Sequence, residues 1–147
     1  MIEVAVLWLV NENGELLLAQ RALHKRQDPG VWGPSVTGKL EPGENAMQAL
    51  LRETQEELSL APSQYIPCFV AELPFLHPDG EQRVFTIYKA AVPSRIRNVI
   101  KFDQDEVAAI EWKSITAINR LLAGKPETLV PSANAIWPQT FASIRVG

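Results

Sequence analysis

Three glutamates recur at a spacing that suits metal binding. Glu53, Glu56 and Glu57 stand at positions i, i+3 and i+4 within residues 38–60. On an α-helix these positions share one face and lie about one turn apart. Like charges held so close repel one another, and carboxylate oxygens are ligands that Mg²⁺ and Mn²⁺ prefer. The spacing therefore predicts a helix with an acidic, metal-binding face.

The apolar residues of the same segment predict how that helix packs. Side chains that can be buried recur every three or four residues and form one stripe, made of Met47, Leu50, Leu51, Thr54 and Leu58. The three glutamates lie away from this stripe on a helical wheel. Asn45 is a good N-cap, and Gln48 completes a capping box with it. Residues 41–44 contain Pro and Gly and have turn chemistry. We expect a strand, a loop and then this helix, with its acids on the open face.

The polar and glycine positions of this segment resemble the Nudix box, G-x5-E-x7-R-E-U-x-E-E-x-G-U, in which U is a bulky aliphatic residue. The matching residues are Gly38, Glu44, Arg52, Glu53, Glu56, Glu57 and Leu60. Thr54 replaces an aliphatic residue, and Ser59 replaces the glycine that ends the helix, which costs up to ~1 kcal/mol in a left-handed conformation. Neither change touches a metal-binding position. The alternative, a solvated acidic helix, does not account for the fixed spacing of the matched positions.

The resemblance implies a set of metal ligands and catalytic groups. The ligands would be the carbonyl of Gly38 and the carboxylates of Glu53, Glu56 and Glu57, holding Mg²⁺ or Mn²⁺. Such a cation screens the charges of a diphosphate and activates a water molecule. Glu53 is the first candidate for the general base, Glu57 is another catalytic carboxylate, and Glu106 is the second candidate for the base or an outer ligand.

Four further residues are predicted to support the site or bind substrate. Arg52 is expected to pair with Glu44 and hold the loop against the helix. Arg21 and Lys39 are fixed cations that could contact substrate phosphates. A solvated strand end is the alternative reading of Arg21.

A second resemblance concerns one branch of the same superfamily. Residues 13–23 and 29–38, with residues 105–107 before Trp112, resemble the isopentenyl-diphosphate isomerase branch of the Nudix superfamily. That branch has a catalytic cysteine just before the motif glycine, where this chain has Thr37, and a histidine metal ligand just after it, where this chain has Lys39. A thiol transfers protons to and from carbon far more readily than a threonine hydroxyl. Isomerase activity is therefore disfavoured.

Composition limits the classes of protein that remain. A chain of 147 residues, 46% of them hydrophobic, can bury one core, so we expect one domain over residues 1–147. A net charge of −3 argues against binding a nucleic-acid polymer. One cysteine cannot form an internal disulfide, which suits a cytoplasmic protein. We see no cleavable signal and no membrane-spanning run. A homodimer is possible, and the sequence does not decide the oligomeric state.

The pattern of apolar runs and turns predicts an α/β fold. Strands are expected at residues 2–10, 15–20, 65–73, 83–92 and 107–112, and residues 31–37 are expected to be extended. Residues 11–14 predict a hairpin turn between the first two strands, and strands 65–73 and 83–92 are expected to pair antiparallel. Helices are expected over residues 46–58, from Ser114 to about residue 122, and over residues 131–144, where Pro138 should kink or break the last helix. Together with the resemblance, this predicts an α/β/α sandwich around a mixed sheet.

Other residues that could carry chemistry have simpler explanations. His24 and His77 lie in polar loops without ligand spacing, so we expect solvated side chains. Cys68 is expected to be a small core residue. Four aromatic residues could stack on a base, although core packing is the simpler role: Trp32, Phe75, Phe85 and Tyr88.

Two functions of different classes are thus compatible with the sequence. The first is a metal-dependent hydrolase of a small-molecule phosphoanhydride, a nucleoside diphosphate linked to a moiety X. The second is a non-catalytic Nudix-fold module that binds a nucleotide or metabolite. The intact acidic triad favours the hydrolase, because a binding module does not need it. The identity of X is left open by the sequence.

Overall fold

A single mixed sheet of seven strands organises the molecule. The computed structural model describes residues 1–146. The strands are β1 (Ile2–Val10), β2 (Leu16–Arg21), β3 (Trp32–Gly33), β4 (Val36–Lys39), β5 (Cys68–Leu76), β6 (Gln82–Ala91) and β7 (Val107–Lys113). The main order is β3-β2-β1-β6-β5, with β4 paired to β1 and β7 paired to β2. Strand β1 is parallel to β6 and antiparallel to β4.

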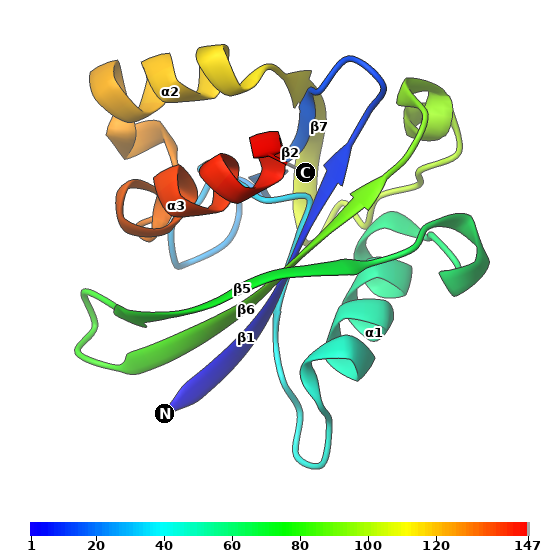
Figure 1. The fold of residues 1–147 in the computed structure, drawn as a ribbon. Coiled ribbons are helices and arrows are strands. Elements are labelled where there is room, and N and C mark those ends of the chain that lie inside the picture. The colour runs from blue at the N-terminus through cyan, green and yellow to red at the C-terminus, as the bar shows by residue number, and fades with distance from the viewer. Residues whose placement is uncertain (147) are drawn as a thin grey trace.

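Three helices cover the sheet on its two sides (Figure 1). They are α1 (Ala46–Leu58), α2 (Ile115–Gly124) and α3 (Ala133–Val146). Helix α1 lies on one face, and α2 and α3 lie on the other. The predicted α/β/α sandwich with a mixed central sheet is confirmed.

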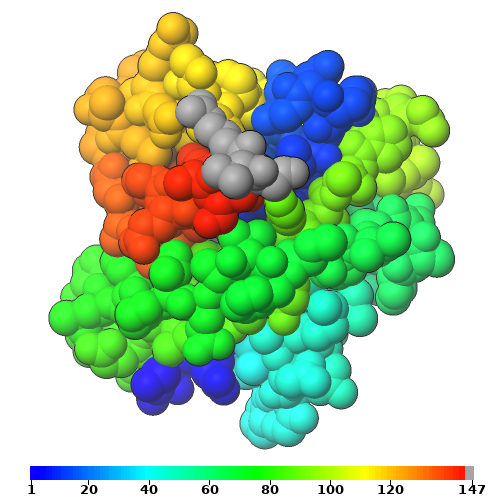
Figure 2. Space-filling view, in the orientation of Figure 1, coloured from blue at the N-terminus to red at the C-terminus, as the bar shows by residue number. Residues whose placement is uncertain are grey.

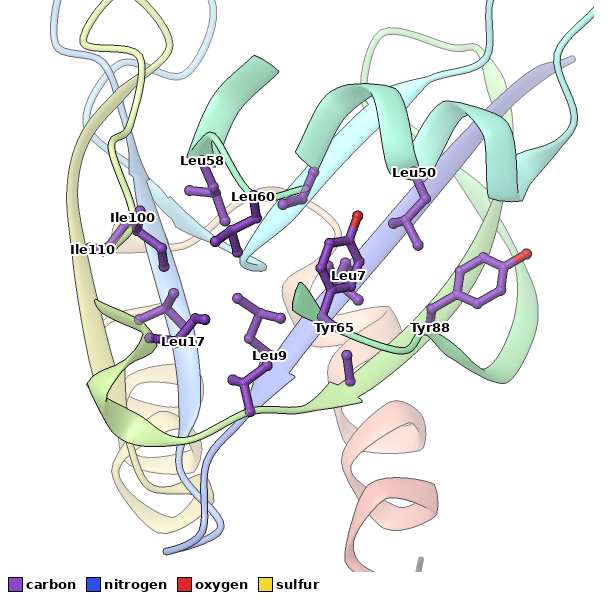
Figure 3. Close-up of a cluster of buried hydrophobic side chains, with 14 of the residues drawn as sticks. Leu7, Leu9, Leu17, Leu50, Leu58, Leu60, Tyr65, Tyr88, Ile100 and Ile110 are labelled. Carbon is purple, nitrogen blue, oxygen red and sulfur yellow. The ribbon is translucent and has the colours of Figure 1, made fainter. Parts of the chain in front are cut away.

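Each face of the sheet has its own core. In β1, Ala5, Leu7 and Leu9 pack toward α1, whereas the alternating Val4, Val6 and Trp8 pack toward α2 and α3. This alternation follows from the two-residue period of a strand. Because both faces are covered, β1 is a continuous apolar run instead of an alternating one. Figure 3 shows the first core, in which Leu50 and Leu58 of α1 meet Leu7 and Leu9.

The second core is built around Trp8. The rings of Trp137 and Phe141 meet it edge to face, with centroids at 5.1 Å and 5.4 Å. Pro138 lies between these two anchors, and α3 continues through it. The break expected at Pro138 therefore does not occur, because the buried aromatic residues on either side hold the helix against the sheet.

Helix α1 begins and ends largely as its sequence indicates. The Asn45 side chain accepts from the Gln48 N–H, and the Gln48 side chain accepts from the Asn45 N–H, so the capping box is formed. Ser59 adopts φ 57° and ψ 36°, the left-handed conformation expected of the missing glycine. Of the predicted stripe, Leu50, Thr54 and Leu58 are buried, and the other two residues pack partly buried beside them.

One further prediction from the sequence is wrong, and another is refined. Residues 31–37, which were expected to be extended, contain β3 and the start of β4, with Pro34 between the two strands. Cys68 is exposed instead of being a small core residue, because it begins β5 at the edge of the sheet. Within residues 1–146, none of the helices combines the length and the apolarity needed to cross a membrane.

Candidate active site

The site begins where β4 approaches α1. A Cβ atom on Gly38 would lie 2.2 Å from Cγ of Glu53, closer than any real contact. Only glycine therefore allows the β4 backbone to lie against this glutamate. The structure thus brings together Gly38 and Glu53, two of the residues that the sequence predicted as metal ligands.

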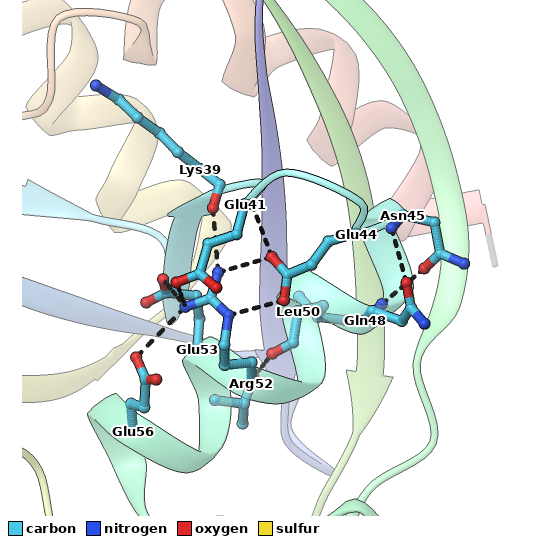
Figure 4. A network of polar contacts seen from close by, with 10 residues as sticks. Lys39, Glu41, Glu44, Asn45, Gln48, Leu50, Arg52, Glu53 and Glu56 are labelled. Atoms are coloured by element: carbon cyan, nitrogen blue, oxygen red, sulfur yellow. Dashed lines mark hydrogen bonds and ion pairs between the residues drawn. The ribbon is translucent and has the colours of Figure 1, made fainter.

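Arg52 links the loop before α1 to the helix (Figure 4). Its Nε and Nη2 donate to the two carboxylate oxygens of Glu44 at 2.8 Å and 2.9 Å, and Nη2 also donates to the carbonyl of Lys39 at 3.2 Å. Such a bidentate pair is both strong and directional. The pairing expected between Arg52 and Glu44 is therefore present, and it fixes the loop that carries β4 into α1.

The same guanidinium also holds two acidic residues of the helix. Arg52 Nη1 lies 2.7 Å from Glu53 Oε1 and 3.5 Å from Glu56 Oε2. Glu53 is largely covered, whereas the Glu56 side chain is 58% exposed. The acidic face predicted from the i, i+3, i+4 spacing is present, and two of its three carboxylates, those of Glu53 and Glu56, are paired with Arg52.

Glu57 is the member of the triad that lines the cavity. Burial, which is the largest cause, and the charges of Glu53, Glu106 and Glu56 together raise the pKa of its carboxyl to about 9. A cation bound beside a carboxylate that is crowded in this way by other acids has a more favourable electrostatic energy than it has in water.

The donor set fits a hard divalent cation. The candidate ligands are carboxylate oxygens and one backbone carbonyl, which are the oxygen donors that Mg²⁺ and Mn²⁺ take. Among residues 1–146, no three His, Cys, Asp or Glu side chains are already arranged around one point. Glu53 and Glu56 are instead paired with Arg52. Glu53, Glu56, Glu57 and the Gly38 carbonyl are the groups that would hold the metal.

The cavity beside this acidic group has a volume of about 340 Å³ and lies between the sheet and α3. Its floor is formed by apolar residues of β1 and β6, and Trp137 of α3 lies on its opposite wall. Arg21 and Lys39, the two predicted phosphate contacts, both line it. An anionic, partly apolar substrate matches this mixture of lining groups.

Glu106 reaches the same cavity from the loop before β7. It lines the cavity and forms an ion pair with Lys25 at 2.8 Å. Residues 53 and 106 are far apart in the sequence, yet both contribute charge around Glu57. The fold therefore places the predicted distal acid next to the acidic helix.

Two residues of the cavity were missed by the sequence analysis. His77 was predicted to be solvated, but its side chain is 10% exposed and lines the cavity together with Arg83. The error arises because the ring packs against Phe75 and is hydrogen-bonded within its own turn to Asp79. Arg83 has a readable signal, since it alternates with Phe85 and Ile87 and so falls on a buried face.

The position just before the motif glycine also faces the cavity. Thr37 lines it, whereas Cys68 does not. No thiol therefore lines the cavity among the residues that the structure describes.

Comparisons with known proteins identify the family and the fold. The family model described as NUDIX domain matches residues 1–133. The isopentenyl-diphosphate Delta-isomerase of Klebsiella pneumoniae is 33% identical over 127 residues, covering 84% of this chain and 67% of that protein. A MutT protein from Methanosarcina mazei Go1 superposes with a TM-score of 0.72 at 21% identity, covering 99% of this chain and 93% of the other. An Ap4A hydrolase from C. elegans gives a TM-score of 0.71 at 19% identity over the whole of both chains.

Proposed function

The chain belongs to the Nudix family, and on that premise we propose that it is a metal-dependent hydrolase of a diphosphate linkage in a nucleoside diphosphate joined to a second moiety. One observation carries the proposal. Gly38, Glu53 and Glu57 meet beside a cavity that is also lined by Arg21 and Lys39. Acidic oxygens for a cation and fixed cations for phosphate are thus held side by side.

Each group has a separate task in this proposal. A bound Mg²⁺ or Mn²⁺ would supply charge neutralisation and water activation. Glu53, Glu57 and Glu106 are the carboxylates placed to hold the metal or to accept a proton from water. Lys39 and Arg21 bind and orient the phosphates. Arg52 and Glu44 support the loop and do not touch the substrate.

The isomerase alternative is supported by sequence likeness and opposed by the cavity. The Klebsiella relative is an isomerase by name. The isomerase branch, however, uses a cysteine at the position of Thr37, and here no described thiol lines the cavity. Besides a divalent cation, the proposed hydrolysis needs only protein groups that the structure contains.

A non-catalytic binding module is the remaining alternative. Such a module would gain nothing from a carboxylate whose pKa is raised to about 9 by burial and by neighbouring acids, because an arrangement of that kind destabilises the ionised form. The retained acidic group therefore favours catalysis.

The direct test is Glu57→Gln, which removes one anionic ligand and keeps the shape of the side chain. Wild type and variant are assayed with Mg²⁺ against nucleoside triphosphates, nucleotide sugars, dinucleotides and prenyl diphosphates. We expect the turnover number to fall by about two orders of magnitude or more, because one charged ligand is lost.

The matched control is Glu127→Gln, which makes the same change at an exposed position outside the cavity. It should keep wild-type turnover. Near-wild-type turnover by a folded Glu57→Gln protein would contradict the assignment.

A further inference from the structure

Arg83 is a charged residue on the buried face of β6. It lines the cavity between the sheet and α3, and its side chain is 13% exposed. Arginine is seldom buried in this way unless its donors are used. Arg83 of β6 is paired with Ile2 of β1, and Gly38 of β4 is paired with Ala5 of the same strand. Because β4 and β6 lie on opposite sides of β1 and the two partners are three residues apart, the Cα atoms of Gly38 and Arg83 are about 14 Å apart.

The donors of Arg83 are only partly used by the protein. Nη2 donates to Asp79 Oδ2 at 2.8 Å. Nε is buried and has no hydrogen-bond partner among the described residues. A buried donor without a partner costs free energy, which a ligand oxygen can recover after a small rotation of the side chain.

His77 lies beside this arginine and is held in a defined orientation. Its Nδ1 lies 3.1 Å from the backbone nitrogen of Asp79 and 3.1 Å from Asp79 Oδ1, so Asp79 fixes the orientation of the ring. In the neutral tautomer that accepts the backbone N–H, the proton is on Nε2. The Phe75 ring meets it at right angles, with centroids 6.2 Å apart. His77 therefore offers one N–H donor in the same wall of the cavity.

The charge balance of this wall selects the kind of group that binds there. Asp79 offsets the charge of Arg83, so the wall offers donors with little excess positive charge. A second phosphate would have little electrostatic attraction to such a wall, because its net charge is small. Neutral carbonyl oxygens and ring nitrogens can still accept directed hydrogen bonds from its donors. Phe85 and Val4 beside it give an apolar floor for a flat ring.

We propose that the cavity wall formed by Arg83 and His77 is a nucleobase-recognition subsite that favours guanine over adenine. Guanine presents two adjacent acceptors, O6 and N7, to paired donors, whereas adenine presents an amino donor at the position of O6. Asp79 positions both side chains and does not touch the base. The inference rests on the proposed function in taking a nucleotide as substrate.

The test is equilibrium binding of GMP and AMP, two purine ligands that no diphosphate hydrolysis can consume. Calorimetric titration of the wild-type protein with Mg²⁺ should show GMP binding about tenfold tighter than AMP, within the range of one bidentate contact. Arg83→Gln should bring the two affinities within about twofold. Arg120→Gln, the same change at an exposed position of α2, should keep the preference.

A second variant guards against misfolding of Arg83→Gln. His77→Phe keeps a flat ring beside Phe75 and removes the donor, so it should reduce the guanine preference while unfolding at a temperature near that of wild type. Equal affinities for GMP and AMP in the wild-type protein would overturn the subsite, as would a preference retained by both variants. A guanine preference in a protein that hydrolyses no nucleotide would support the subsite and refute the proposed hydrolase, so the two failures are distinguishable.

Discussion

At the scale of single residues, the best-defined interaction of the site is the pair of Arg52 and Glu44. Two charge-assisted hydrogen bonds join them, and Glu44 also accepts the backbone N–H of Glu41 at 2.8 Å. The hydrogen bond from Arg52, with that of Glu41, lowers the pKa of Glu44 from 4.5 to about 2. The pair therefore ties the loop of residues 40–44 to the helix as long as Glu44 is ionised.

This pair predicts a specific response to acid. A carboxyl whose pKa is lower in the folded state contributes stability above its unfolded pKa, and this contribution is lost as the pH falls through the folded value. We expect Glu44→Gln to lower the melting temperature at neutral pH and to flatten its decline between about pH 5 and pH 3. Thermal unfolding followed by circular dichroism across this range measures both effects.

Glu127→Gln provides the comparison, because Glu127 is exposed and forms no ion pair with a described residue. Its melting curve should follow that of wild type at every pH. If Glu44→Gln declined as steeply in acid as wild type, another carboxylate would have to account for the acid sensitivity.

At the scale of elements, the end of α1 shows how one departure from the Nudix pattern is accommodated. Ser59 takes the left-handed conformation that favours glycine, and its hydroxyl donates to the carbonyl of Lys101 at 2.9 Å. The hydrogen bond joins the helix end to the loop before β7. It offsets part of the conformational cost of a side chain at this position.

Two substitutions separate these opposing effects. Ser59→Ala loses the hydrogen bond and keeps the strain, whereas Ser59→Gly loses both. We expect the glycine variant to be more stable than the alanine variant by about 1 kcal/mol, measured by urea unfolding. An alanine variant as stable as the glycine variant would mean that the left-handed conformation is not retained.

The acidic face of α1 gives a prediction about metal binding. A cation that binds only the folded state raises stability by mass action, by about 2.7 kcal/mol at a concentration 100 times its Kd. We therefore expect the melting temperature of the wild-type protein to rise with Mg²⁺ or Mn²⁺.

The variant with Gln at positions 53, 56 and 57 should be insensitive to metal and more stable than wild type without it. At neutral pH a carboxyl with a pKa of about 9 must take up a proton on folding, and Gln at position 57 removes this cost. We expect this gain to outweigh the loss of the ion pairs that Glu53 and Glu56 form with Arg52. An equal response of this variant and of wild type to metal would locate the cation elsewhere.

At the scale of the whole molecule, helices cover both faces of the sheet, and the cavity described above lies between the sheet and α3. In Figure 2, β5 crosses the face between α3 on one side and the segment that contains α1 on the other. The cavity takes its acidic groups from α1, from the loop before β7 and from Asp28 in the loop after β2, and its walls include residues of β1, β6 and α3. Its chemistry therefore depends on which residues the whole fold brings to it.

The absence of a thiol from the described cavity wall predicts the outcome for the isomerase reaction. Moving a double bond needs a proton placed on one carbon and removed from another, and Thr37 is too weak an acid to replace a thiol. We expect no deuterium incorporation when the protein is incubated with isopentenyl diphosphate in deuterated water and followed by NMR. The Klebsiella isomerase is the positive control. Catalytic incorporation into the allylic product would refute the hydrolase assignment.

The sequence alone determined the local parts of this protein. The period of Leu50, Thr54 and Leu58, the capping box at Asn45 and the alternating faces of β1 are set within a few residues, and all are observed. The spacing of the acidic triad and the pairing of Arg52 with Glu44 were also predictable, because they span one turn of helix and one short loop. Interactions of this range depend on backbone geometry that neighbouring residues fix.

Only the tertiary structure decided which distant residues share the cavity. Glu106 lies near Glu57 because the loop before β7 is hydrogen-bonded to the end of α1, where the Asp103 N–H donates to the Glu57 carbonyl at 2.9 Å. Arg83 reaches the cavity because β6 pairs with β1, which is far from it in the chain. The exposure of Cys68 was wrongly predicted because it depends on strand order, which leaves β5 at the edge of the sheet. That of His77 was wrongly predicted because it depends on the packing of its ring against Phe75. Local spacing thus determined the groups that could bind a metal, and the packing of the sheet determined what surrounds them.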